Sequence, residues 1–201
     1  DAAQTIGNGD ALELTSALVK KSLIVVDRGS GGMTRYRFHE IVRQYARQKL
    51  VDAGEEDEIR KQHLRYFLDL SRQIEPGLQG PQQMEWFNQA NDERDNMRAA
   101  LEYASRTDTE AGLYLSSLQH SFWESVNLRE GSHWLARFIQ KPEANDFPHA
   151  KAKALYTLGV LHIWTQDFAQ ATSFAQECLA LFQACGDQQG EADALILLGY
   201  S

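Results

Sequence analysis

The stretch LYTLGVLHIWTQDFAQA, residues 155–171, decides how this sequence is expected to fold. Apolar residues recur every three to four positions on both sides of the polar break at residues 165–167, which predicts two amphipathic helices joined by a tight turn. Gly159 in the first helix has no side chain and Ala171 in the second has a small one, so we expect close approach of the two helices here. The stretch therefore predicts a helical hairpin.

A spacing of forty residues extends this hairpin into a repeat. The spacing relates Leu115, Leu155 and Leu195, then Leu118, Leu158 and Leu198, and also the pairs Leu128 and Phe168, Gly131 and Ala171, and Trp134 and Phe174. A fixed period between 20 and 50 residues is typical of a stacked array, in which each unit covers the apolar face of its neighbour. We expect helical pairs over 109–140 and 147–184, a linker over 141–146, and a third pair that begins at 188.

The N-terminal part has a different pattern. Residues 11–22 have helical spacing, residues 23–26 are a β-branched run, residues 27–34 are a Gly-rich turn, and residues 35–38 alternate like a strand. A helix begins at His39 and is ended by Gly54. This order of elements is that of the second half of a winged helix-turn-helix.

The middle of the chain is expected to connect these parts. The acidic residues 55–58 suit the positive end of a helix that runs to about Ile74. A loop rich in Pro and Gly follows over 76–81, and residues 82–105 form one helix or two. The predicted fold is mainly α: a partial winged helix at 1–54, a connecting helical hairpin at 55–107, and a solenoid of helical hairpins at 108–201.

Bulk composition limits the function classes. The chain has 201 residues and a net charge of −8. Residues 11–50 contain eight Lys and Arg against three Asp and Glu, a net charge of +5, which leaves −13 for the rest. The acidic part is a poor candidate for nucleic-acid binding. No stretch approaches the ~18 apolar residues that a membrane span needs. Cys178 and Cys185, seven residues apart on one helix, are too distant for a disulfide, which predicts reduced thiols in a cytoplasmic protein.

The hairpin at 147–184 resembles a tetratricopeptide repeat (TPR). The resemblance rests on Leu155, Leu158, Gly159, Phe168 and Ala171. The sequence departs from the usual TPR pattern in its period of forty, in Ala175 where an aromatic residue is common, and in the absence of a closing proline. The resemblance implies a right-handed TPR-like α-solenoid that binds a protein or a small effector.

Residues 36–46, YRFHEIVRQYA, resemble the end of the winged-helix subdomain of STAND or NB-ARC nucleotide-switch ATPases, where a Met-His-Asp triplet precedes a helix. Here Phe38-His39-Glu40 stands in place of that triplet. Together with the repeats, the arrangement is similar to bacterial transcriptional regulators of the AfsR or LuxR/MalT type. The resemblance implies an upstream nucleotide-binding domain as a partner, and Asp1, which is not a natural start, also suggests a piece of a longer protein.

The resemblance implies that His39 contacts the β-phosphate of ADP in an intact parent that binds ADP or ATP. The alternative is that His39 only opens a helix. No G-x-x-x-x-G-K-[ST] occurs in the chain, so we expect no cofactor and no enzymatic activity in this chain. No metal-binding spacing of His and Cys and no catalytic triad pattern is present either. The glycines at 29, 31 and 32 precede a strand, which indicates a hairpin turn and not a phosphate loop.

Five basic residues of the N-terminal part are candidates for a contact with DNA or with another domain: Lys20, Lys21, Arg28, Arg35 and Arg37. In the resembled ATPases this subdomain serves the switch, so DNA binding by this chain is the less favoured interpretation. The alternative to the regulatory interpretation as a whole is a DNA-binding winged-helix protein whose repeats form a dimerisation or peptide-sensing arm.

The register of the repeats predicts which residues face a concave groove. Projected from one repeat to the next, the inward set contains Leu113, Glu124, Lys153 and Asp193 together with the nine residues predicted to line the groove, which are Ser116, His120, Trp123, Tyr156, Val160, Ile163, Trp164, Ile196 and Tyr200. Aromatic residues of this kind suit capture of a peptide or a small effector. The alternative is that Trp123 and Trp164 pack between neighbouring hairpins as core residues.

Overall fold

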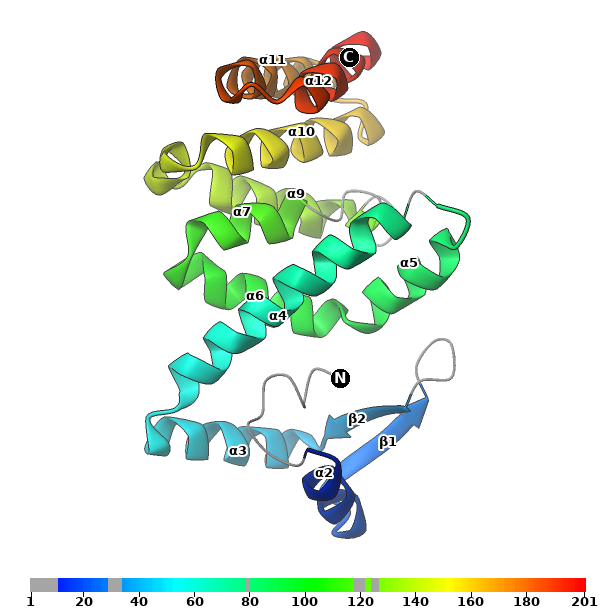
Figure 1. The fold of residues 1–201 in the computed structure, drawn as a ribbon, viewed down its shortest axis with the longest axis vertical. Coiled ribbons are helices and arrows are strands. Elements are labelled where there is room, and N and C mark those ends of the chain that lie inside the picture. The colour runs from blue at the N-terminus through cyan, green and yellow to red at the C-terminus, as the bar shows by residue number, and fades with distance from the viewer. Residues whose placement is uncertain (1–10, 29–33, 79, 118–121, 124–126) are drawn as a thin grey trace.

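The computed structural model describes residues 11–28, 34–78, 80–117, 122–123 and 127–201. Within these residues the chain is mainly helical, as predicted: ten α-helices, one 3-10 helix and one two-stranded sheet. The elements follow one another along the longest axis of the molecule, from the N-terminal part at the bottom of Figure 1 to the last helix at the top.

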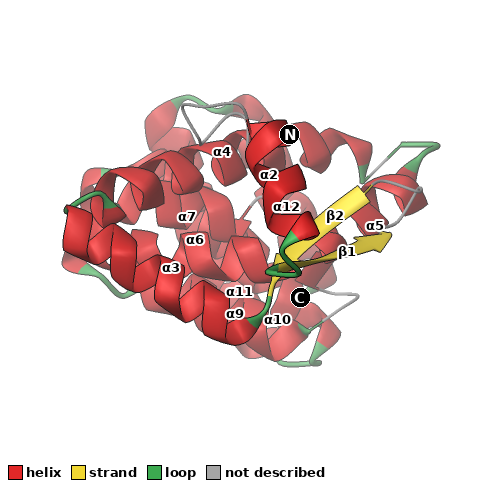
Figure 2. Cartoon of the chain, turned by 90° about the horizontal axis from the view of Figure 1, so that it is seen from below, coloured by secondary structure: helices red, strands yellow, loops and turns green. Residues whose placement is uncertain are grey.

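The first four elements form what we call the N-terminal module, residues 11–54. They are α2 (Ala11–Lys20), β1 (Ile24–Arg28), β2 (Thr34–Phe38) and α3 (Glu40–Ala53). The strands are antiparallel, with Ile24 opposite Phe38 and Val26 opposite Tyr36, and Figure 2 shows them side by side, with α2 over one end. The predicted order of helix, strand, strand and helix is confirmed, and most of the predicted turn lies outside the described residues.

A long helix, α4 (Glu56–Gly77), connects this module to the remaining helices. Gly54 allows the chain to turn between α3 and α4, because it has φ +70°, where glycine is favoured, and its N–H donates to the last carbonyls of α3. Two helices follow, α5 (Gln83–Asp92) and α6 (Arg94–Thr107), which resolves the alternative of one helix or two. α3 ends at Ala53 and α6 at Thr107, and the division of the chain into domains near these positions stays a prediction.

The C-terminal part is a stack of helices: α7 (Thr109–Ser117), α9 (Leu128–Ile139), η2 (Pro142–Asp146), α10 (Pro148–Trp164), α11 (Phe168–Cys185) and α12 (Gln188–Tyr200). In this stack, which continues upward in Figure 1, α10 packs against both α7 and α9, and α11 packs against α10 and α12. The linker predicted at 141–146 is the 3-10 helix η2. α7 is described as far as Ser117, and most of the residues that follow it in the predicted first helix lie outside the described residues.

Residues that are forty positions apart are in direct contact at one place in the stack. The Thr157 hydroxyl on α10 donates to the carbonyl of Ser117, forty residues earlier, at 3.1 Å. Leu115 and Leu155 are both buried, but Leu195, the third member of their series, is 56% exposed. In the described residues no element covers that side of α12.

Gly159 lies where three helices meet. A Cβ built there would be 3.6 Å from the carbonyl oxygen of Ala171 on α11, as the sequence predicted, and only 2.7 Å from Leu197 Cδ2 on α12. The glycine therefore fits α10 against both of the following helices. Asp167 and Asp187 begin α11 and α12, since each side chain accepts a hydrogen bond from a backbone N–H three residues later.

Two groups of buried residues hold the helices together. The larger group extends from α4 to α10, and the smaller one joins α10, α11 and α12. Neither contains a residue of the N-terminal module, and among the side chains described between residues 13 and 53 only Ile24 is buried. The module is therefore not part of the apolar core of the helix stack. None of the described helices combines the length and the apolar character that crossing a membrane requires.

Candidate ligand-binding groove

An apolar pocket of about 300 Å³ lies between α10 and α12. Its lining residues are Tyr156, Val160, Ile163 and Trp164 from α10, and Ile196, Leu197 and Tyr200 from α12. Steps of three and four positions place residues on one side of a helix, so each helix presents one apolar stripe to the pocket. Trp164 is 63% exposed and Ile196 57%, which is unusual for such large apolar side chains on adjacent helices. Concave apolar sites of this kind suit a ligand or a partner.

Six of the nine residues predicted for the groove line this pocket: Tyr156, Val160, Ile163, Trp164, Ile196 and Tyr200. The register of the repeat therefore identified side chains that the structure brings together. That they bind a ligand stays a prediction.

The prediction is wrong for Ser116 and Trp123, which are 0% and 2% exposed and so cannot line a groove. The Ser116 hydroxyl donates to the carbonyl of Gly112 at 2.8 Å, within its own helix. Trp123 Nε1 donates to the carbonyl of Ser116 at 3.0 Å, and the ring fills the space left by Gly131, where a Cβ would be 2.5 Å from Trp123 Cγ. Trp123 is a core residue, as the alternative interpretation proposed. His120 lies outside the described residues.

A second, polar pocket of about 610 Å³ adjoins the apolar one, and Tyr156 lines both. It is lined by Arg72, Glu75 and Pro76 from α4, Ser117 from α7, His149, Lys153, Tyr156 and Thr157 from α10, Phe182 from α11, and Asp187, Gln189, Gly190 and Asp193 from the start of α12. We call these two adjoining pockets together the groove. It has a polar end toward the beginnings of α10 and α12 and an apolar end toward their last turns.

His149 connects three helices at the polar end. Its Nδ1 is 3.0 Å from the hydroxyl of Tyr114 on α7, and its Nε2 is 3.0 Å from the carboxylate of Asp187 before α12. The Asp187 carboxylate also accepts from the backbone N–H of Gly190 at 3.0 Å. The Gly190 N–H first, and then His149, lower the pKa of Asp187. This wall of the polar pocket therefore carries a negative charge at neutral pH.

His39 is exposed at the start of α3, directly after β2, and its side chain makes no capping hydrogen bond. The side chain is thus accessible on the surface of the N-terminal module. A contact with ADP in a longer protein stays a prediction.

The five basic candidates have different surroundings. Lys20 and Lys21 are exposed, and Arg28 ends β1 opposite Thr34. Arg37 forms an exposed ion pair with Asp27 at 2.6 Å, within the sheet.

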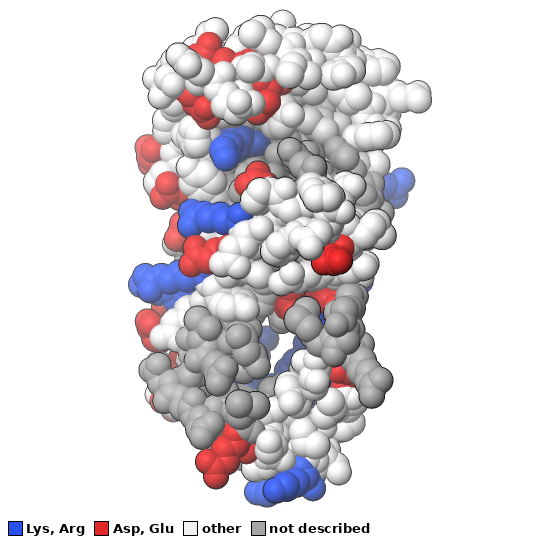
Figure 3. Space-filling model, turned by 45° about the vertical axis from the view of Figure 1, so that its right-hand side comes forward, with Lys and Arg blue, Asp and Glu red and all other residues white. Residues whose placement is uncertain are grey.

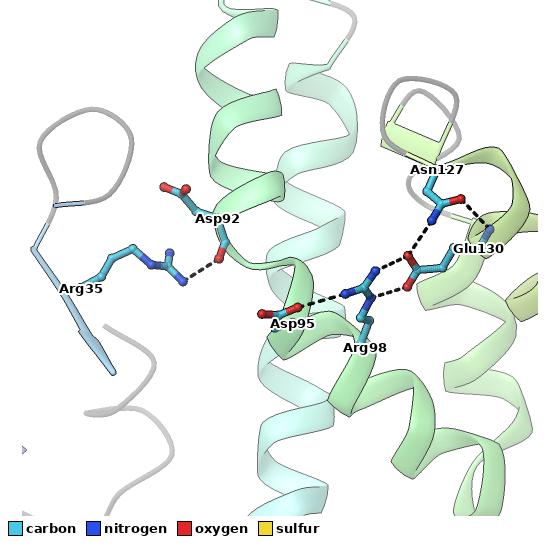
Figure 4. A network of polar contacts seen from close by, with 6 residues as sticks. All are labelled: Arg35, Asp92, Asp95, Arg98, Asn127 and Glu130. Carbon is cyan, nitrogen blue, oxygen red and sulfur yellow. Dashed lines mark hydrogen bonds and ion pairs between the residues drawn. The ribbon is translucent and has the colours of Figure 1, made fainter. Parts of the chain in front are cut away.

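Arg35 instead contacts the helix stack. Its guanidinium donates to the Glu93 carboxylate and to the Asp92 carbonyl, both at 2.6 Å, at the corner between α5 and α6, and Figure 4 shows the bond to Asp92. The contact is partly buried, since the two side chains are 30% and 20% exposed. Arg35 therefore holds the N-terminal module against the helix stack.

Polar contacts continue from this corner toward the repeats. Arg98 on α6 forms a bidentate ion pair with Glu130 on α9 and a second bond to Asp95 (Figure 4). Asn127, which caps α9, donates to the same glutamate and accepts from its backbone N–H. The hydrogen bond from Arg98 holds the pKa of Glu130 below its ordinary value.

The two cysteines are free, as the sequence predicted. Burial raises the pKa of Cys178 to about 12, so its thiol stays protonated at neutral pH. Cys185 is exposed at the end of α11.

The sequence revealed only part of the polar pocket, since the repeat register placed Lys153 and Asp193 inward but gave no sign of the residues from α4. Arg72 and Glu75 reach it because α4 crosses beside the repeats, and the path of that helix cannot be deduced from local patterns. One signal was present: an aspartate three residues before Gly190, directly ahead of a helical pattern, is a helix N-cap that fixes the position of its carboxylate.

The sequence is similar to that of two curated mycobacterial proteins. It is 32% identical over 199 residues to a protein of Mycobacterium tuberculosis (strain ATCC 25618 / H37Rv) and, equally, to one of Mycobacterium bovis (strain ATCC BAA-935 / AF2122/97). Both carry the provisional name HTH-type transcriptional regulator. The match covers 94% of this chain but 22% of each relative, so the chain spans about a fifth of their length. No family model matches the chain, and no solved structure gives a significant match.

Proposed function

We propose that this chain is a segment of a transcriptional regulator and that its groove is the site where a partner or an effector is sensed. The observation that carries the proposal is the apolar pocket, in which residues from two helices forty positions apart expose aromatic and aliphatic side chains. The names of the relatives support the regulatory class. No residue of this chain is assigned a catalytic role.

The helix stack supports a TPR-like interpretation of the sensor. Successive helices form hairpins, the first helix of one hairpin packs on the previous hairpin, and Thr157 contacts Ser117 across one period. Solenoids of this kind form extended concave surfaces on which the first helices of the repeats are exposed. The groove has this arrangement, since it lies between α10 and α12, which are one period apart.

The proposed mechanism is a two-state switch in which ligand binding favours one position of the N-terminal module. The module resembles the end of a winged-helix subdomain. It is connected to the helix stack through Gly54, through the exposed ion pair between Arg47 and Glu56, and through the contact of Arg35 at the corner between α5 and α6. In the longer protein His39 would contact ADP in the resting state and lose that contact when the module moves.

A variant pair with matched exposure tests the role of the groove. Ile196 lines the apolar pocket and is 57% exposed, whereas its neighbour Leu195 is 56% exposed and is not a lining residue. Ile196→Asp in the full-length regulator is expected to abolish its effect on the transcripts that it controls, and Leu195→Asp is expected to preserve it. Equal transcript profiles of the wild type and Ile196→Asp would refute the proposal.

The role of His39 has a separate test. We expect His39→Ala in the full-length protein to release bound ADP faster than the wild type, because an imidazole donor to phosphate would be lost. Unchanged ADP retention would remove His39 from the mechanism without affecting the groove.

The alternative function is DNA binding through the N-terminal module, which the names of the relatives favour. Lys20 and Lys21 are exposed, but Arg35 and Arg37 already form ion pairs, which reduces their availability for phosphates. A salt-dependent gel shift that is lost in a Lys20→Ala, Lys21→Ala variant would support this alternative, and absence of a shift at low salt would exclude it.

A further inference from the structure

The groove changes from polar to apolar along its length, because the lining residues of both α10 and α12 change from polar to apolar in the same direction. On α10 the lining residues are His149 and Lys153, followed by Tyr156 and Val160. On α12 they are Gln189 and Asp193, followed by Ile196 and Tyr200. A ligand that occupies the whole groove must therefore have a polar group and an apolar group in a fixed order.

The polar end is acidic overall. Three carboxylates line it, those of Glu75, Asp187 and Asp193, against the two cations of Arg72 and Lys153. On the face in Figure 3, acidic side chains also collect at one side of the C-terminal end, and uncharged side chains cover most of the other side. Since the whole chain has a net charge of −8, an anionic ligand would meet a repulsive field.

Asp193 is the carboxylate best placed to receive a cationic group. It is half-buried in the groove, one turn before Ile196, and it accepts a hydrogen bond from Gln189 Nε2 at 3.1 Å. A carboxylate has about four acceptor sites, so capacity remains. Asp187 by contrast is already engaged by Gly190 and His149.

We propose that the groove binds an extended peptide that places a large apolar side chain in the apolar pocket and a Lys or Arg side chain against Asp193. The inference rests on the proposed function of the groove as a binding site and names the class of ligand. Donors and acceptors alternate along a peptide backbone, and the polar end offers both kinds of partner, from Lys153 and Arg72 and from the carboxylates.

The helix geometry sets the spacing of the two peptide residues. The middle of the Ile196 and Tyr200 pair lies five residues after Asp193, about 7.5 Å along the axis at 1.5 Å per residue. An extended chain advances about 3.3 Å per residue, and side chains two positions apart point to the same side. The basic and the apolar residue of the peptide are therefore expected two positions apart.

Intrinsic fluorescence provides the assay, because Trp164 lines the apolar pocket, whereas Trp123 and Trp134 are buried and Trp86 is half-buried. The probes are acetyl-Gly-Arg-Ser-Leu-Gly-amide and its reverse order, the same peptides with Glu or Ala in place of Arg, and versions with no residue or with two residues between Arg and Leu. We expect a blue shift on binding and an affinity for one of the two Arg-x-Leu orders that is about fivefold higher than for the Ala peptide, with the Glu peptide weakest.

A matched pair of variants completes the test. Asp193→Asn is expected to remove the fivefold preference for Arg, and Glu191→Gln, which changes a carboxylate on the same helix that does not line the groove, is expected to keep it. Equal affinity for Arg, Ala and Glu peptides would overturn the inference about charge and leave the groove as a binding site. No binding of any probe would also overturn it. The proposed function would fail separately, if the Ile196→Asp regulator controlled its transcripts like the wild type.

Discussion

Gly112→Ala is predicted to destabilise the helix stack, although alanine is the better helix former. Gly112 lies in α7 beneath Phe138 of α9, whose ring is fully buried. A Cβ at position 112 would be 2.0 Å from Phe138 Cε1 and 2.3 Å from Cζ. Because carbon atoms pack at about 3.5 Å or more, the ring would have to withdraw by about 1.5 Å into surroundings that are already filled.

Two opposing terms decide the magnitude. Replacing a helical glycine by alanine stabilises by about 0.5–1 kcal/mol. Forcing one extra carbon into a packed core costs about 1–3 kcal/mol, and a shift of this size belongs in the upper half of that range. We therefore expect a net loss of about 1–2.5 kcal/mol in the free energy of unfolding, measured by urea denaturation followed by circular dichroism.

Two other glycines serve as controls. At Gly199, in α12, no described atom lies within 4 Å of an added Cβ, so alanine is expected to stabilise by up to about 1 kcal/mol. At Gly159 the nearest atom is the flexible end of Leu197, and we expect a change near zero. If Gly112→Ala were as stable as the wild type, the packing of α7 on α9 described here would be wrong. A double-mutant cycle with Phe138→Leu gives a second check. We expect a coupling energy of at least about 0.5 kcal/mol between Gly112→Ala and Phe138→Leu, and no coupling would show that the two side chains do not pack together.

Three further changes test other contacts. Arg35→Gln is expected to accelerate chymotrypsin cleavage between the N-terminal module and the helix stack, because it removes their partly buried contact. Arg37→Gln, which removes an exposed ion pair within the sheet, should leave the cleavage rate unchanged. Equal cleavage rates for the two variants would contradict this prediction. Glu130→Gln should lower the free energy of unfolding above about pH 4.3, the ordinary glutamate pKa, because the folded protein holds the pKa of Glu130 below that value. The difference between the variant and the wild type should disappear as pH falls further. A difference that stays constant in urea unfolding across this pH range would contradict the prediction. Thr157→Val should cost about 1 kcal/mol in the same measurement, because a buried carbonyl loses its donor, and more than Thr172→Val, whose hydroxyl is exposed.

The elements were predictable from the sequence where local chemistry decides them. Gly54 and Gly186 end their helices with φ +70° and +68°, the conformation that a glycine after a helical pattern predicts. The order of elements in the N-terminal module follows from β-branched and Gly-rich runs in the same way. The α5–α6 corner was undecided, because residues 82–105 contain no proline or glycine and the break at Glu93 depends on tertiary packing.

The groove was predictable only where the repeat is regular. Residues on α10 and α12 are related by the forty-residue register and do share one pocket. The same projection failed for Trp123, because its ring is buried against Gly131 and its Nε1 bonds to the carbonyl of Ser116, so it does not face the groove. At the polar end of the groove the register did place Lys153 and Asp193 inward, but it missed Arg72 and Glu75. These two belong to α4, a helix more than seventy residues away in sequence from some of the residues that it faces.

The way in which the parts are joined indicates where a conformational switch would act. Neighbouring hairpins share buried apolar side chains, so their relative positions are set by close packing. Among the described residues the N-terminal module shares none with them, and the partly buried contact of Arg35 with the α5–α6 corner is polar. A polar contact can exchange its partners for water at small net cost, whereas an apolar core cannot be opened in this way. A ligand that draws α12 toward α4 would therefore strain this joint before it separated the hairpins. The ion pair of Arg98 with Glu130 joins α6, the helix that begins at the same corner, to α9 of the repeats.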